Sequence, residues 1–72
     1  MADYVELSTP HHGVALVTVT DPERQNNLCW QAVGELADTL TQAREEGARV
    51  TVVASGVQGH WLEHAWLTDL AN

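Results

Sequence analysis

The sequence is poor in basic residues and in long apolar runs, and each shortage excludes a class of protein. Three Lys and Arg stand against ten Asp and Glu, which gives a formal net charge of -7. Nucleic acids and anionic membrane surfaces are therefore not expected as partners, because neutralising phosphates requires clustered basic side chains. No apolar run approaches the roughly 20 residues of a membrane-spanning helix, so no membrane association is expected.

The sequence contains one cysteine, and no targeting signal is recognised at the N-terminus. Cys29 stands alone, which excludes an internal disulfide and a zinc site built from paired cysteines, and neither a metal nor a cofactor is expected. The first residues lack the basic and then apolar order of a secretion signal, which favours a cytoplasmic location. With 72 residues the chain has room for one small domain, spanning residues 1–72.

Period-2 and β-branched patterns predict strands in the first part of the chain. Residues 4–7 alternate as a short strand does, and residues 8–13 are turn formers. Residues 14–20 form a β-branched run that is apolar on both parities, which predicts a strand covered on both faces. The polar residues 21–27, with Pro22, then predict a loop between a strand and a helix.

A helical period follows, and then another β-branched run. Apolar residues recur at helical spacing from residue 29 to residue 46, and Gly47 is a plausible stop with Arg44 in the last turn. Residues 49–54 read as a buried parallel strand. The fold class is therefore α/β: a β-β-α-β unit with a right-handed crossover helix. One helix shields only one face of a sheet, so we expect a homo-oligomer or a partner chain to cover the rest.

At these residues the sequence resembles the N-terminal portion of the crotonase superfamily, the enoyl-CoA hydratases and isomerases. That family follows its strand with a Pro-Glu-like turn, an Asn-Ala-Leu-Ser motif, a Val-rich strand and a Gly-x-Gly-x-Ala-Phe-Ser-Ala-Gly-Ala-Asp segment. The matching residues here are Asp21-Pro22-Glu23-Arg24, Asn26-Asn27-Leu28-Cys29, and the ranges 50–54 and 56–66. The resemblance covers nearly the whole chain but only the first third or less of the family, and it implies a truncated crotonase-like unit with a short C-terminal helical turn.

The resemblance also implies a site for an acyl-CoA thioester. The backbone N–H of Ala65 would donate to the thioester oxyanion, Trp61 matches the family's Phe, and Arg24 stands in a loop that often contacts CoA. Glu63-His64 and Trp66 replace small residues and an Asp of the family pattern, so the loop is bulkier. In the family the second oxyanion donor and the catalytic carboxylates come from later elements, so the resemblance implies that this chain is inactive alone, both as a lyase and as an isomerase.

Other motifs have simpler interpretations. The segment His60-Trp61-Leu62-Glu63-His64 matches the H-x-x-E-H pattern of some zinc proteases, but it follows two glycines in a loop and lacks a third ligand. His11 and His12 are read as a solvated turn rather than a ligand pair. Cys29 starts the helix but has no nearby His or Asp to activate it, which favours a small buried residue.

The remaining aromatic and charged residues leave the function open. Trp30, Trp61 and Trp66 suit either an adenine or acyl site or apolar cover at an oligomer contact, and Arg24 read without the family is a solvated loop charge. Two hypotheses follow. The first is a crotonase-like unit that is inactive alone and keeps one oxyanion amide for an acyl-CoA. The second is a non-catalytic assembly or docking module that oligomerises or binds a partner subunit.

Overall fold

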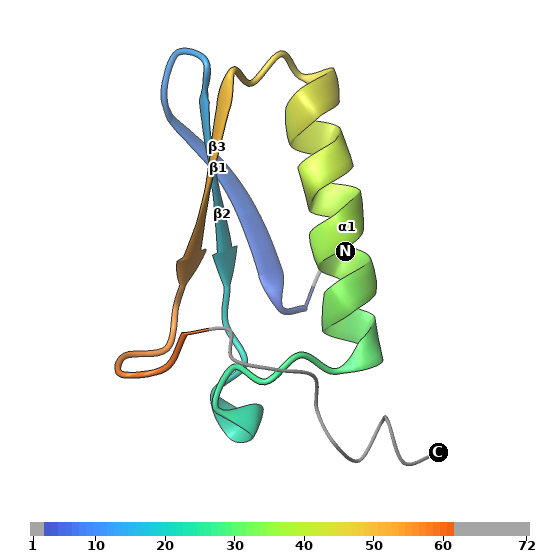
Figure 1. Cartoon of the computed structure of the whole chain (residues 1–72), viewed down its shortest axis with the longest axis vertical. Helices are drawn as coiled ribbons and strands as arrows, with labels where there is room; N and C mark the ends of the chain where they lie inside the picture. The colour runs from blue at the N-terminus through green and yellow to red at the C-terminus, as the bar shows by residue number, and fades with distance from the viewer. Residues whose placement is uncertain (1–2, 62–72) are drawn as a thin grey trace.

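The computed structural model describes residues 3–61, and these form a three-stranded sheet with one helix lying against it (Figure 1). The elements in chain order are β1 (Val5–His11), β2 (Val14–Val19), the 3-10 helix η1 (Pro22–Arg24), α1 (Trp30–Glu45) and β3 (Val50–Ser55).

The strands lie in the order β1-β2-β3, with β2 in the centre. A tight turn at Gly13, where φ is 79°, joins β1 to β2, and the two strands pair antiparallel. β2 pairs parallel with β3, which requires a crossover, and α1 supplies it. The β-β-α-β order and the crossover helix predicted from the sequence are thus confirmed.

The core lies between the sheet and α1. Alternate residues of β2 point toward the helix, so Ala15, Val17 and Val19 are buried. Val5 of β1 joins Val17 and Val19 in one cluster. Partly buried side chains from β1, α1, β3 and the adjoining loops pack around this cluster: Tyr4, Leu7, Leu28, Leu36 and Val53.

The opposite face of the sheet carries no helix in the described part of the chain. Leu16 of β2 is half-buried there, and its β3 partner Val52 is 45% exposed. Within residues 3–61 α1 covers one face of β2, as expected of a single helix, and cover of the other face by a second copy or a partner chain stays a prediction. The apolar side chains of both parities are present, but only one set faces α1, because a single helix covers one face of a sheet.

β1 is longer than the sequence pattern predicted. Residues 8–13 were expected to turn, whereas the strand continues to His11 and the turn is confined to His12 and Gly13. Pro10 is tolerated because β1 is an edge strand, on which a missing N–H costs little. The pairing with β2 does become irregular between Ser8 and His11, so the signal for a break was real but too weak to end the strand.

The bounds of α1 agree with the predicted helix to within one residue at each end. Cys29 occupies the N-cap position without a capping hydrogen bond from its side chain. After the last turn Gly47 adopts a φ of 89°, and the N–H of Ala48 donates to the carbonyl of Ala43 at 3.1 Å. A glycine in this conformation is the usual way to end a helix. The short C-terminal helical turn expected from the sequence lies outside the described residues.

Glu35 fastens α1 to the start of β1. Its Oε1 accepts hydrogen bonds from the backbone N–H groups of Tyr4 at 2.7 Å and Val5 at 3.2 Å, while Gln31 Nε2 donates to Oε2 at 2.8 Å. Burial alone would raise the pKa of Glu35, but the hydrogen bonds to the carboxylate outweigh it and the pKa is lowered from the ordinary value of 4.5.

We expect this fastening to make stability depend on pH. A carboxyl group whose pKa is lower in the folded state stabilises the fold above its unfolded pKa, and that contribution is lost as pH falls through the folded pKa. The free energy of unfolding should therefore decrease as the pH falls below 4.5. Urea unfolding of wild type and Glu35→Gln across that range measures it. The variant should be less stable at neutral pH and lose less on acidification; parallel pH curves for the two proteins would contradict the assignment.

Candidate functional site

The carboxyl ends of β2 and β3 lie side by side at one end of the sheet, because the two strands are parallel. This end is called the carboxyl edge, as distinct from the edge strands β1 and β3. The chain leaves β2 into the loop that contains η1, and it leaves β3 into residues 56–61. Figure 1 shows both loops, together with the beginning of α1, at the same end of the molecule. Ligands of open α/β sheets bind at such an edge, so this is the candidate site.

Arg24 projects from η1 into a packed environment. Its Nη1 donates to Oδ2 of the buried Asp21 at 3.1 Å, and its guanidinium lies 5.9 Å from the centre of the Tyr4 ring. The hydrogen bond to Asp21 is the main reason that the pKa of Arg24 is raised. Through this bond Arg24 helps to hold the η1 loop together.

The loop after β3 lies against the end of β2. The N–H of Gly56 donates to the carbonyl of Val19 at 2.8 Å. A Cβ atom at Gly56 would stand 1.9 Å from Thr20 Oγ1 and 3.0 Å from Thr20 Cβ, so the two loops touch with no room for a side chain. Glycine is needed here for close approach rather than for its conformation.

The structure places two of the predicted site residues at this edge. Arg24 lies in the loop after β2, and Trp61 lies at the end of the loop after β3 with 52% of its surface exposed. Ala65, the predicted oxyanion donor, lies outside the described residues. Contact of Arg24 or Trp61 with an acyl-CoA stays a prediction.

The alternative motifs can be placed in the same way. Cys29 is buried, as the interpretation as a small core residue requires. His60 is half-buried and its backbone takes part in the loop after β3. The remaining histidine and glutamate of the zinc-like pattern lie outside the described residues. Within residues 3–61, no group of three or more His, Cys, Asp or Glu side chains could hold a metal ion.

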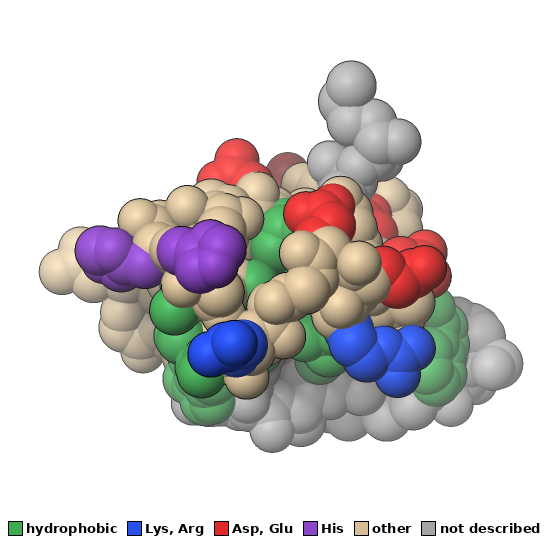
Figure 2. All heavy atoms as spheres, turned by 90° about the horizontal axis from the view of Figure 1, so that it is seen from above, with side chains coloured by type: hydrophobic (Ala, Val, Ile, Leu, Met, Phe, Trp, Pro, Cys, Tyr) green, Lys and Arg blue, Asp and Glu red, His purple; other side chains and the backbone are tan. Residues whose placement is uncertain are grey.

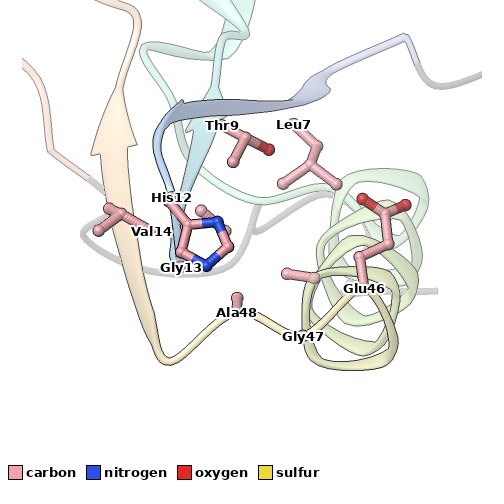
Figure 3. A pocket seen from close by; sticks show the side chains of 10 residues that line it. Leu7, Thr9, His12, Gly13, Val14, Glu46, Gly47 and Ala48 are labelled. Carbon is pink, nitrogen blue, oxygen red and sulfur yellow. The ribbon is translucent and has the colours of Figure 1, made fainter.

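A cavity of about 150 Å³ lies at the opposite end of the sheet, between the β1–β2 turn and the end of α1 (Figure 3). His12 stands on one side of it and Glu46 on another, and its walls are otherwise mostly small or apolar. Because it adjoins the amino ends of β2 and β3, it is separate from the candidate site at their carboxyl ends.

The same end of the molecule carries the histidine pair. Figure 2 looks onto it and shows histidine side chains on one side and acidic side chains on the other, with apolar surface between them. His11 and His12 are both exposed. Both are solvated as predicted, but His11 is the last residue of β1 and only His12 lies in the turn.

Sequence reasoning missed two polar residues at the candidate site. Asn26, in the loop between η1 and α1, is fully buried, and its Nδ2 donates to Ser55 Oγ at the end of β3 over 2.7 Å. Asn26 belongs to the Asn-Ala-Leu-Ser resemblance, which gave it no role. Ser55 had one weak signal, which is a hydroxyl directly after an apolar strand.

Comparison with known proteins identifies the fold. No protein-family model and no curated protein matches the sequence. Among solved structures, the chain is similar to an enoyl-CoA hydratase from Thermoplasma volcanium, with a TM-score of 0.81 and 25% sequence identity. The match covers 96% of this chain but only 27% of that one, so the chain spans about a quarter of its structural neighbour.

The protein is thus a crotonase-like β-β-α-β unit, equivalent in extent to part of an enoyl-CoA hydratase. This confirms the resemblance and the fold class predicted from the sequence. None of the helices in residues 3–61 has the length and apolar character needed to cross a membrane.

Gly56 offers a direct test of the contact between the two loops. The variant Gly56→Ala should destabilise the fold by about 1–3 kcal/mol, because its Cβ overlaps the Thr20 side chain. Removing Oγ1 with Thr20→Ala should recover part of that loss in the double variant. Gly34→Ala is a matched control in α1, where a Cβ meets nothing and should stabilise the helix by roughly 1 kcal/mol. Urea unfolding measures all four proteins, and a Gly56→Ala variant as stable as wild type would contradict the contact.

Proposed function

We propose that this chain forms one wall of an acyl-CoA thioester site and contributes one oxyanion donor, the backbone N–H of Ala65, without turning substrate over alone. The fold match to an enoyl-CoA hydratase over 96% of the chain is the observation that carries the proposal. The sequence pattern from residue 50 to residue 66, which resembles the oxyanion segment of that family, supports the choice of Ala65.

The arrangement of the two loops is consistent with this role. A backbone donor needs a rigid segment behind it, because the catalytic value of such a group comes from being fixed before the charge develops. The loop that leads toward Ala65 is bonded to the end of β2 through Gly56 and to Asn26 through Ser55. Arg24, which is paired with Asp21, stands at the same edge and would face the anionic end of a CoA.

Inactivity of the isolated chain follows from the chemistry of the reaction class. Hydration or isomerisation of an enoyl thioester requires proton transfer as well as oxyanion stabilisation, and each contributes at least about a hundredfold. The resemblance assigns the second donor and both carboxylates to elements beyond the region matched here. One donor alone therefore binds a thioester weakly and accelerates nothing measurable.

Titration of the 15N-labelled chain with a short 2-enoyl-CoA, and separately with CoA, tests this function by NMR. The thioester should shift the Ala65 amide signal where CoA does not, and no hydrated product should form above the buffer control. Ala65→Pro removes the N–H and should weaken thioester binding about fivefold, the worth of one hydrogen bond. Ala65→Gly keeps the N–H and is the matched control. Equal binding by the proline variant, or hydration above background, would refute the proposal.

The uncovered edge of the sheet favours a second candidate function, as an assembly module that associates through β3. In the described part of the chain β1 and β3 are the two edge strands. β1 carries Glu6, Pro10 and irregular pairing, all of which discourage further strands. Residues 50–59 include no charged residue and no proline, so the β3 edge has no such protection.

Apolar side chains surround the unprotected edge. Val50 is 54% exposed and Val52 is 45% exposed on the face without a helix. On the other face α1 packs mainly over β1 and β2, and its Val33 and Leu40 are partly exposed. A second copy that paired its β3 antiparallel with this one would continue the sheet and cover the exposed valines. No acidic residue within residues 50–59 would oppose that contact.

Val52→Lys should keep such a protein monomeric by placing a charge in the contact. Ser8→Lys is its matched control, because Ser8 and Val52 are the two neighbours of Leu16 in the same row of the sheet, and Ser8 lies on the β1 side. Light scattering over a range of concentrations should show dimers for wild type and for the Ser8 variant. A wild-type chain that stays monomeric throughout, or an equal effect of both lysines, would contradict this function.

A further inference from the structure

Asn26 occupies a position that few residues tolerate. Its φ is 63°, in the left-handed region, where asparagine is enriched among non-glycine residues. The side chain is fully buried, and each of its polar groups is used. Oδ1 accepts from the N–H of Asp21 at 2.7 Å, and Nδ2 donates to the carbonyl of Val19 at 2.9 Å and to Ser55 Oγ at 2.7 Å. This one amide therefore joins the end of β2 to the end of β3.

The Ser55 hydroxyl extends this connection along the loop after β3. Besides accepting from Asn26, Oγ accepts from the N–H of Val57 at 3.1 Å. The hydroxyl donates to the carbonyl of His60, and the carbonyl of Val57 lies 3.1 Å away as a further acceptor. A single side chain thus holds both the beginning and the end of residues 56–60.

These bonds are separate from those that hold the sheet. β2 and β3 pair in parallel register from Val14 with Val50 to Val19 with Ser55, so the ladder does not need the Asn26 side chain. Only the Ser55 hydroxyl bonds directly to residues 56–60, which have no ladder of their own, while Asn26 holds that hydroxyl against the end of β2. Asn26 therefore acts on the loop through Ser55, whose hydroxyl bonds to Val57 at the start of the loop and to His60 at its end.

We propose that Asn26 and Ser55 are a positioning pair: through the Nδ2 to Oγ hydrogen bond they fix the course of residues 56–60 over the end of β2. The value of this for a thioester site rests on the proposed function, because that loop leads to the segment assigned the oxyanion donor. The fixing of the loop itself does not depend on that assignment.

Amide hydrogen exchange of the 72-residue chain tests the pair. Ser55→Ala removes the hydroxyl, and Asn26→Gly removes the amide while keeping the left-handed backbone accessible. In both variants the amides of Val57 and His60 should exchange about fivefold faster, the loss expected from one hydrogen bond at Ser55 Oγ. The amides of Val17 and Val53 in the ladder should change far less. Ser55→Thr keeps a hydroxyl and should restore slow exchange in the loop.

The outcomes separate the pair from the proposed function. Loop amides that stay protected in both variants, equal acceleration of loop and ladder amides, or failure of threonine to rescue would each overturn the positioning role. The titration with a short 2-enoyl-CoA, repeated on Ser55→Ala and Ser55→Thr, tests whether the pair supports thioester binding. A wild-type chain that ignores the thioester but shows the local exchange pattern would refute the thioester site and leave the pair standing. A thioester response that Ser55→Ala and Ser55→Thr leave equal to wild type would show that the pair does not serve the site.

Discussion

Parallel pairing of β2 with β3 is the constraint on which the rest of the structure depends. Two parallel neighbours cannot be joined by a tight turn, so the chain must cross over, and α1 provides both the connection and the cover for one face. The same pairing puts the carboxyl ends of both strands at one edge. The loops that carry Arg24, Asn26 and Trp61 meet there because the sheet is parallel at that point.

Hydrogen bonds between buried polar groups hold the loops at the carboxyl ends of β2 and β3 in place. Asp21 binds Arg24, Asn26 binds both strand ends, and Ser55 binds the following turn, so buried polar groups take the place of an apolar core. Buried polar groups are stable only when their hydrogen bonds are satisfied, and such networks specify one geometry. A site that needs a fixed backbone donor gains from this kind of support.

The sequence predicted the elements well wherever a local pattern decides the structure. The bounds of α1 follow from its helical period and from Gly47, and β2 and β3 follow from their valines. The end of β1 was missed, because Pro10 signals a turn locally and is tolerated only at an edge. Asn26 and Ser55 were missed for a similar reason: their roles depend on contacts 29 residues apart, which periodicity does not register. The prediction for Ala65 falls outside the described residues and stays untested.

The acidic composition has a consequence for handling the protein. At neutral pH a charge of -7 makes copies of the chain repel one another, which opposes contact between their bare β3 edges. Acidification neutralises the carboxylates and weakens that repulsion, but because the pKa of Glu35 is lowered, its bonds to the backbone of Tyr4 and Val5 are lost only at lower pH. Mildly acidic buffers therefore weaken the repulsion between copies while Glu35 still holds α1 to β1, and precipitation through strand edges without charged residues is expected there before the fold itself is weakened.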